Sequence, residues 1–330
     1  MEKPLKKLKL DVRTSERKIC FAAPTHLSNT FGGGELQLCL LAEEFVNKGW
    51  DVSYISAQKK NIDESHLNPK IKYFYYKPCR FKIIEVFNMQ KCIKKIDANF
   101  YYQRIDDFIT GIVAFHCKKS KDRKFIYACA HDLNCQKWRK TKTMWKWKTS
   151  FFYRLAWIFN VGILTDILTF YGKKNADYRL VQSQKQQSLM KENLELDSKI
   201  VKNGFPITPL EDSSKENIIL WTASLRGVKR PEIFIKLVQE IKLKDWKFVM
   251  IGKCLEKEYQ NITKNVSNPN FIYLGEQPIS EVNQWFKKSK IFINTSESEG
   301  FPNTFLQAWT HHTLLISVFF DPDNILKNKN

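Results

Sequence analysis

Hydrophobic and polar positions along the chain follow two alternating patterns. Short runs rich in β-branched and aromatic residues are typical of buried strands, and longer segments with apolar residues at helical spacing separate them. The clearest helix is Glu35–Lys48, and Gly49 follows it as a stop signal. In the first half the predicted strands are Lys18–Ala23, Asp51–Ser56, Ile71–Tyr76, Asn99–Gln103, Lys124–Ala130, Asp177–Gln182 and Lys199–Lys202. The alternation predicts an α/β chain whose first half is a doubly wound parallel sheet.

A polar segment, Pro206–Lys215, interrupts this pattern and is the best candidate for a linker. The same alternation then restarts, so we expect two domains, 1–206 and 207–330. Predicted strands of the second domain are Asn217–Ala223, Lys247–Gly252, Phe271–Gly275, Lys290–Asn294 and Leu314–Phe320. Predicted helices are Pro231–Lys242, Leu255–Lys264, Ser280–Lys288 and Pro302–Thr310. Two Rossmann-like lobes are expected to face a cleft at the carboxyl ends of their strands, where open α/β sheets bind ligands.

Composition excludes disordered and fibrous classes, because 43% of the 330 residues are hydrophobic and only 12 are glycine. The eight cysteines include no C-x-x-C pair and mostly fall in apolar runs, as expected for thiols in a reducing compartment. The N-terminal residues lack the apolar core of a secretory signal. These features predict a cytoplasmic protein.

The formal charge of +20 points to polyanionic partners. The densest basic stretch is Lys137–Lys148, which has six basic residues, three tryptophans and no acid. Three interpretations stay open: a solvated face, docking on an anionic membrane through indole rings and lysines, and single-stranded nucleic acid stacked on the tryptophans, which is the least favoured. The following segment, Leu155–Gly172, has 18 residues without Lys or Arg but contains polar positions, so we expect a core or interfacial helix rather than a membrane span.

Two features of the first half are candidates for ligand binding. A glycine turn containing Gly33 and Gly34 joins the first strand to the first helix, where backbone N–H groups favour an anion. Its spacing is not that of a dinucleotide fingerprint, and a tight turn without ligand is the alternative. His131 follows the strand Lys124–Ala130, at the edge where a ligand would bind, although a lone histidine is more often structural.

Two loops of the second half carry the strongest chemistry. Arg226, Lys229 and Arg230 lie on a strand-to-helix loop, where cations can neutralise a diphosphate. The segment Asn294–Gln307 places Glu299 before Gly300 and Pro302 at a helix start, so a hydroxyl acceptor precedes free amides that can bind phosphate. The alternative interpretation of the loop with Arg226, Lys229 and Arg230 is a charged loop that binds no ligand.

These segments together resemble retaining glycosyltransferases of family 4. The resemblance rests on Ser-Glu-Ser-Glu-Gly-Phe-Pro-Asn-Thr, Phe-Ile-Tyr-Leu-Gly, Lys-Arg-Pro, Val-Lys-Asn-Gly-Phe-Pro and Gly-Gly-Gly-Glu, which occur in the family's order. It is strong over 217–309 and loose over 60–175. It implies the GT-B fold, a nucleotide-sugar donor bound mainly by the second lobe, an acceptor bound mainly by the first, and no obligatory metal or other cofactor.

The resemblance also implies roles for single residues. Lys229 resembles the lysine that stabilises the departing diphosphate, Glu299 the glutamate that holds donor sugar hydroxyls, and His131 the histidine near the transferred sugar. Gly33 and Gly34 resemble the first-lobe loop near the diphosphate. The turn whose amides face the donor corresponds to Phe301, Pro302, Asn303 and Thr304.

Three positions depart from the family pattern. The second glutamate, expected on the ribose, is Gln307, which loses a charge-assisted hydrogen bond. The arginine expected before the lysine is Ser224, so Arg226 is the expected substitute. The chain ends at Asn330, where the family continues, so we expect an incomplete second lobe.

The leading hypothesis is a retaining glycosyltransferase of the polysaccharide or cell-envelope type. It would move a sugar from a nucleotide-sugar to a hydroxyl of a glycan or lipid-linked acceptor, peripherally on the inner face of the plasma membrane. The alternative is a catalytically degenerate GT-B protein that binds a membrane or a partner. Nucleic acid is not an expected partner.

Overall fold

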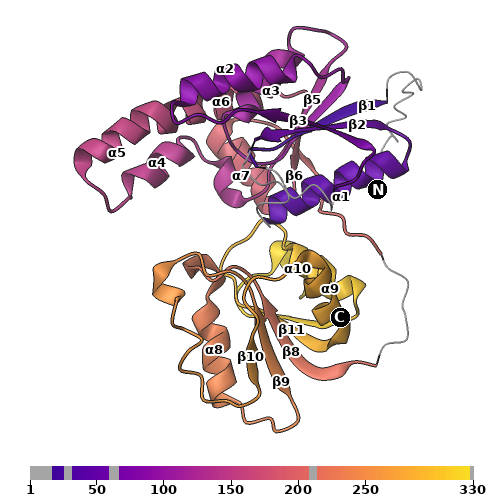
Figure 1. Ribbon diagram of the computed structural model, residues 1–330, viewed down its shortest axis with the longest axis vertical. Coiled ribbons are helices and arrows are strands. Elements are labelled where there is room, and N and C mark those ends of the chain that lie inside the picture. The colour runs from indigo at the N-terminus through magenta and orange to yellow at the C-terminus, as the bar shows by residue number, and fades with distance from the viewer. Residues whose placement is uncertain (1–16, 26–31, 59–66, 208–213, 328–330) are drawn as a thin grey trace. The chain divides into compact units, whose positions relative to one another are not determined.

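The computed structural model shows two compact units, each built on its own parallel sheet (Figure 1). It describes residues 17–25, 32–58, 67–207 and 214–327. The first unit contains the residues up to Cys129 together with Gln136–Leu180 and Lys191–Lys199. The second contains Ala130–Cys135, Val181–Met190 and the residues from Ile200 onward. The units are therefore not continuous segments, and the predicted boundary between residues 206 and 207 does not anticipate the two short segments of the second unit.

The first sheet has seven strands in the order β3-β2-β1-β4-β5-β6-β7. Its strands are β1 (Lys18–Ala22), β2 (Asp51–Ala57), β3 (Ile71–Tyr76), β4 (Phe100–Gln103), β5 (Lys124–Ala128), β6 (Tyr178–Val181) and β7 (Lys199–Ile200). The pairs from β3 to β6 are parallel. The strand order reverses between β1 and β4, as in a doubly wound fold. The predicted α/β class is confirmed.

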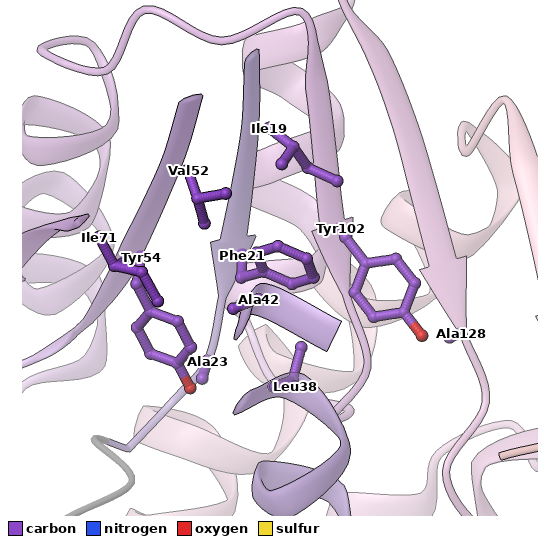
Figure 2. Packing of buried hydrophobic residues seen from close by; sticks show 10 residues of the cluster. All are labelled: Ile19, Phe21, Ala23, Leu38, Ala42, Val52, Tyr54, Ile71, Tyr102 and Ala128. Atoms are coloured by element: carbon purple, nitrogen blue, oxygen red, sulfur yellow. The ribbon is translucent and has the colours of Figure 1, made fainter. Parts of the chain in front are cut away.

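Helices cover both faces of this sheet (Figure 1). Those that contact its strands are α1 (Gly33–Asn47), α2 (Lys82–Ile93) and α3 (Ile109–Cys117). Helix α6 (Ile163–Lys174) packs on α3, while α4 (Arg139–Trp145) and α5 (Phe151–Trp157) pack on the π-helical turn η4 (Ile158–Gly162) that joins α5 to α6. Helix α7 (Gln184–Leu194) follows β6. Leu38 and Ala42 of α1 pack on Phe21 of β1 and Tyr102 of β4, all of them buried (Figure 2). The predicted helix Glu35–Lys48 is confirmed as α1.

Helices α3 and α6 approach each other unusually closely. A Cβ atom at Gly111 would lie 2.5 Å from the carbonyl oxygen of Leu168, and a Cβ at Gly172 would clash with the backbone of Thr110. Only glycine allows this separation of the two backbones. One face of α6 therefore packs closely against α3.

The second sheet has five parallel strands in the order β10-β9-β8-β11-β12. They are β8 (Glu216–Thr222), β9 (Lys247–Ile251), β10 (Phe271–Tyr273), β11 (Ser289–Asn294) and β12 (Leu314–Ser317). Helices α8 (Pro231–Glu240), α9 (Ile279–Lys288) and α10 (Asn303–Thr310) pack on them. Trp221 and Phe234 fill one face and Phe286, Phe292 and Phe305 the other. The order repeats that of β3 to β5, so the predicted second Rossmann-like lobe is confirmed.

The predicted helix Leu255–Lys264 is wrong. Only a short 3₁₀ turn, η6 (Lys257–Tyr259), forms there. Glu256 is extended, with φ −119° and ψ 132°, because its carboxylate accepts a hydrogen bond from the amide of Gly227 at 2.8 Å. A tertiary contact has overridden the local helix propensity.

The predicted linker, Pro206–Lys215, is described only at its two ends. Residues 208–213 lie outside the described residues. Lys215 is anchored in the second unit: its ammonium donates to the carbonyls of Phe286, Ser289 and His311 and to the hydroxyl of Thr313 at 2.6–3.0 Å. The second sheet is therefore fastened from its first strand onward.

Candidate functional site

Two loops of the second unit meet where its strand order reverses. Strands β8 and β11 are neighbours, while the strand after β8 in sequence, β9, lies on the other side of β8. Loops leaving the carboxyl ends of such a pair diverge to opposite faces and leave room for a ligand. Lys229 lies on the loop after β8 and Glu299 on the loop after β11.

Hydrogen bonds fasten these two loops to each other. The hydroxyl of Thr295 donates to the carbonyl of Lys229 at 2.7 Å, and the amide of Glu297 donates to the carbonyl of Val228 at 3.0 Å. The indole of Trp221 donates to Thr295 at 2.8 Å from the buried core. Arg230 adds an ion pair with Glu297. The positions of both loops are thus fixed by the fold of the second unit.

Lys229 and Glu299 form an ion pair, with Nζ to Oε1 at 2.7 Å. Their side chains are only 13% and 16% exposed. Partial burial reduces screening, so each charge strongly stabilises the other. The two residues that the sequence singled out independently are therefore direct partners.

Lys229 ends a short 3₁₀ turn, η5 (Gly227–Lys229), and Arg226 immediately precedes this turn. Its Nε atom is buried and has no hydrogen-bond partner among the described residues. A buried unpaired donor costs roughly 1–3 kcal/mol, so a ligand acceptor at this place would be favoured. Glu256, which the sequence analysis did not single out, holds the turn through the amide of Gly227.

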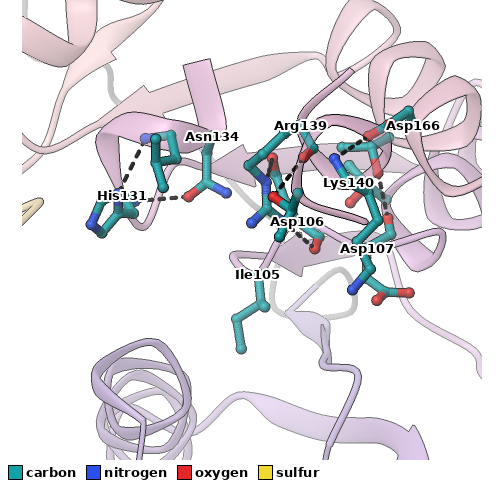
Figure 3. Close-up of polar contacts among 12 residues, drawn as sticks. Ile105, Asp106, Asp107, His131, Asn134, Arg139, Lys140 and Asp166 are labelled. Atoms are coloured by element: carbon teal, nitrogen blue, oxygen red, sulfur yellow. Dashed lines mark hydrogen bonds and ion pairs between the residues drawn. The ribbon is translucent and has the colours of Figure 1, made fainter. Parts of the chain in front are cut away.

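His131 belongs to the second unit and precedes the 3₁₀ turn η3 (Asp132–Cys135). Its Nδ1 accepts the amide of Leu133 at 3.1 Å, and its own amide donates to Asn134 at 2.8 Å (Figure 3). The first bond places the proton of the neutral ring on Nε2. The ring is thereby fixed in one orientation and one tautomer.

Burial is the main cause that lowers the pKa of His131, and the charges of Lys229 and Arg226 lower it further. The carboxylates of Asp132 and Glu299 act in the opposite direction. The net pKa is below the ordinary value, so the imidazole is neutral at pH 7. His131 is thus electrostatically part of the same site as Lys229 and Glu299.

A chain of amide side chains supports the loop after Glu299. Gln182 accepts the amide of Phe301 at 3.0 Å, and Gln186 accepts the amide of Gln182 at 2.9 Å. Gln186 then donates to Asp132 at 3.1 Å. No sequence motif singled out these residues, and the only local signal is the i, i+4 spacing of Gln182 and Gln186 after a strand.

These hydrogen bonds reduce the number of backbone amides that the predicted donor-facing turn, Phe301 to Thr304, can offer to a ligand. The amide of Phe301 is taken by Gln182, and Pro302 has no N–H. Asn303 and Thr304 lie in the first turn of α10, which has no side-chain cap. The contact of this turn with a donor stays a prediction.

Gly300 is required where this loop passes the rest of the unit. A Cβ there would lie 2.5 Å from the carbonyl oxygen of Ala130 and 3.0 Å from the amide nitrogens of Gln182 and Gln186. Asn203 closes the other side by donating to the carbonyl of Phe301 at 3.0 Å. Gly300 allows Glu299 to be held next to the loop that carries His131.

Gln307 is buried on α10, with 3% exposure, and its amide donates to Asn283 of α9 at 2.8 Å. Asn283 was not expected as a partner. The proposed contact of Gln307 with a ribose stays a prediction.

Gly33 and Gly34 lie in the first unit, at the start of α1. Helix α1 begins after Gly32 without a side-chain cap, so its first amides are not used by a cap. A Cβ at Gly34 would come within 3.1 Å of Ile105. Most of the loop before them, residues 26–31, lies outside the described residues, and their contact with a diphosphate stays a prediction.

Residues 216–329 match a family described as glycosyl transferases group 1. This match covers the second sheet and both loops of the candidate site. The match indicates a glycosyltransferase domain at these residues. No curated protein sequence matches the chain.

Three solved structures with a similar fold share less than 25% identity with this chain. A sucrose-phosphate synthase from Thermosynechococcus elongatus is 13% identical with a TM-score of 0.67, and the match covers 91% of this chain and 81% of that one. HepE from Anabaena, in complex with UDP and glucose, is 15% identical with a TM-score of 0.63 over 95% and 83% of the chains. TarM from S. aureus, in complex with Fondaparinux, alpha-GlcNAc-glycerol and UDP, is 9% identical with a TM-score of 0.68 over 93% and 87%. The likeness shows the fold: the two Rossmann-like lobes of the GT-B type are confirmed.

Proposed function

We propose that the chain, in which residues 216–329 match the group 1 glycosyl transferases, transfers a sugar from a nucleotide-sugar to an acceptor hydroxyl with retention of configuration. The observation that carries this proposal is the Lys229–Glu299 pair on the two loops where the second sheet reverses its order. A cation and a hydroxyl acceptor side by side suit a substrate that joins a diphosphate to a sugar. HepE and TarM, which share the fold, were crystallised with UDP, so a uridine nucleotide is the first donor to test.

Lys229 and Arg226 act on the leaving group in this proposal. Negative charge grows on the diphosphate as the bond to the sugar breaks, and fixed cations in a partly buried site stabilise that charge most strongly. Arg226 adds a second positive charge on the same loop, and its Nε has no hydrogen-bond partner among the described residues. Because these side chains supply the positive charge, we propose that transfer requires no obligatory metal.

Glu299 and His131 orient the sugar. The carboxylate accepts sugar hydroxyls while it remains next to Lys229. The neutral His131 donates through Nε2, because Nδ1 is already used by Leu133. We propose same-face attack, with a phosphate oxygen of the leaving group helping to remove the acceptor proton.

The acceptor is proposed to be a glycan or a lipid-linked glycan at the inner face of the plasma membrane. Exposed aromatic residues gather on α4, α5 and η4 of the first unit: Trp138, Trp145, Trp147, Phe151, Phe152, Tyr153 and Phe159. Tryptophan and lysine together favour the boundary between water and anionic lipid. This surface supports interfacial binding and gives no support to nucleic acid over membrane.

Helix α2 extends the same surface. Asn160 of η4 accepts the amide of Lys82 at 3.0 Å and donates to the carbonyl of Arg80 at 2.9 Å. This tie joins η4 to the start of α2, where Phe81, Ile84 and Phe87 are exposed. The exposed aromatic surface therefore extends from η4 to the start of α2, and the two hydrogen bonds of Asn160 join these elements.

Within the described residues, the helical run Phe151–Lys174 is long and apolar enough to cross a bilayer by length and composition. Its second half is α6, which the close contacts at Gly111 and Gly172 pack against α3. We therefore propose that this run lies at the membrane surface rather than across it.

The alternative function is a GT-B protein that binds a membrane or partner without turnover. Gln307 in place of a glutamate favours it, whereas the intact Lys229–Glu299 pair opposes it.

A donor panel with anomer-resolved NMR tests the proposal. The full chain is incubated with nucleotide-sugars and a glycan acceptor, and the new linkage is read from the anomeric signals. We expect one donor to react with retention. A product of inverted configuration would contradict the retaining mechanism, and no turnover of any donor despite nucleotide binding would favour the degenerate protein.

A further inference from the structure

The first unit contains a cavity of about 470 Å³ that the proposed reaction does not use. It lies between the start of α4, helix α6 and Leu194 of α7. Its wall is mainly apolar and includes Trp138, Ile167, Phe170, Tyr171 and Leu194. The volume is in the range of ordinary small-molecule sites.

The acidic residues of the cavity are already paired. Asp106 forms an ion pair with Lys173 at 2.6 Å, both side chains 3% exposed, and it also accepts the hydroxyl of Tyr127 at 2.6 Å. Asp166 caps α4 by accepting the amides of Lys140 and Thr141 at 2.9 and 2.8 Å (Figure 3). Asp166 keeps its charge, because it bonds only to neutral amides, but the two carboxylates face five cations in the wall, Lys137, Arg139, Lys140, Lys173 and Lys174, so a net positive charge remains.

Three lysines of the cavity wall, Lys137, Lys140 and Lys174, have no carboxylate partner in the part of the chain that the structure describes. Lys137 instead lies over the ring of Phe170, 5.9 Å from its centroid. The wall therefore combines an apolar surface with uncompensated positive charge. An anion with an apolar body fits both properties.

A buried hydroxyl marks the inside of the cavity. Thr165 lines it and is 3% exposed, and its Oγ1 has no hydrogen-bond partner among the described residues. Leaving a buried hydroxyl unpaired is unfavourable, so this atom indicates where a polar group of a ligand would bind.

The backbone also holds an aromatic side chain at the cavity. Trp138 immediately precedes α4 with φ 57° and ψ 32°, a left-handed conformation that is unfavourable for a tryptophan. This conformation sets the direction of the half-exposed indole at the cavity wall.

We propose that this cavity binds an anionic lipid that has a single apolar chain, with its phosphate head near Lys137, Lys140 and Lys174. The apolar wall takes the alkyl or prenyl chain, and the hydroxyl of Thr165 bonds to an oxygen of the lipid. The proposal rests on the cavity alone and does not depend on the sugar transfer.

Calorimetry of the full chain with decyl phosphate below its micelle concentration tests the proposal. We expect one equivalent to bind, and decyl maltoside and inorganic phosphate to bind at least tenfold more weakly. Equally tight binding of inorganic phosphate would overturn the proposal, because a basic patch alone would then suffice. No binding of decyl phosphate, or binding of several equivalents, would also overturn it.

Paired variants locate the ligand. Ile167→Asp, at a half-exposed position of the wall, is expected to weaken decyl phosphate binding at least tenfold. Leu255→Asp is the control, because it makes the same kind of change at an exposed apolar position of the second unit, outside the cavity. Thr165→Val keeps the shape without the hydroxyl and is expected to weaken binding about threefold or more. Unchanged binding in both Ile167→Asp and Thr165→Val would overturn the assignment to this cavity.

Discussion

Lys229 and Glu299 show how single residues gain function from their surroundings. Each is a common surface residue, and an exposed pair of this kind contributes about 0–1 kcal/mol. Here both side chains are largely buried on loops fixed by Thr295 and Val228. Their fixed positions make Lys229 suitable for a diphosphate and Glu299 suitable for sugar hydroxyls.

Replacing Lys229 by methionine is expected to lower the turnover number at least about 100-fold, because the leaving-group charge loses its main partner. Lys253→Met is the matched control, since Lys253 forms an exposed pair with Glu276 at 2.8 Å in the same unit. Turnover is measured by nucleotide release, and thermal melting confirms the fold. Activity of Lys229→Met within threefold of wild type would exclude the role assigned to this ammonium.

His116 is a residue of the fold rather than of the site. It is 5% exposed, its Nε2 lies 3.0 Å from the hydroxyl of Tyr101, and burial lowers its pKa from 6.5 to about 4. The unfolded chain binds the proton first as the pH falls, so the contribution to stability is complete above pH 6.5 and is lost toward pH 4. The loss corresponds to about 3 kcal/mol.

Denaturant unfolding of wild type and His116→Gln between pH 7.5 and pH 4 tests this linkage. The wild type is expected to lose more unfolding free energy over this window than the variant. Equal losses would show that His116 does not carry the pH dependence.

At the scale of elements, the loop from Glu299 to Asn303 is held in place by distant contacts and by one glycine. The segment from Glu299 to Asn303 is positioned by Gln182, Asn203 and the backbone of Ala130, and only the missing side chain of Gly300 permits that approach. The segment is thus fixed by contacts with residues more than 90 positions away in the chain.

Gly300→Ala is expected to displace this segment, destabilise the protein by about 1–3 kcal/mol and reduce turnover. Gly204→Ala is the control, because no atom lies within 4 Å of its added Cβ and its φ is not in the left-handed region. Melting curves and nucleotide release are compared for the two variants. Wild-type behaviour of Gly300→Ala would mean that the loop is not held as tightly as described.

The predictability of elements follows from the range of their contacts. Strands such as Ile71–Tyr76 were predicted with their observed bounds, because alternating or continuous apolar runs are local properties. The helix at Leu255–Lys264 failed because Glu256 binds Gly227, which is distant in sequence. Likewise, Lys229 and Glu299 were each identifiable from a local motif, whereas Gln182 and Asn283 depend on packing that no local pattern shows.

The whole molecule carries a charge of +20, part of it beside exposed aromatic residues of the first unit. If this surface binds anionic membranes, flotation with anionic vesicles is expected to capture the protein and high salt to release it. Changing Trp138, Trp145 and Trp147 to alanine should abolish capture.

The controls for flotation separate the remaining interpretations. Capture by neutral vesicles that resists salt would indicate that Phe151–Lys174 crosses the bilayer. Absence of capture under all conditions would leave the aromatic surface without a membrane role, and steeply salt-dependent binding to single-stranded nucleic acid instead would favour that partner.

The central claim is that the second unit binds a nucleotide-sugar, with its diphosphate at Lys229 and its sugar hydroxyls at Glu299. Calorimetry of the full chain against a panel of nucleoside diphosphates, UDP first, tests it most directly, with Lys229→Met and Lys253→Met measured in parallel. The account predicts that at least one nucleoside diphosphate binds at one site, that Lys229→Met weakens this binding at least tenfold, and that Lys253→Met leaves it within twofold. Failure of every nucleoside diphosphate to bind, or equal affinity in wild type and Lys229→Met, would contradict the account.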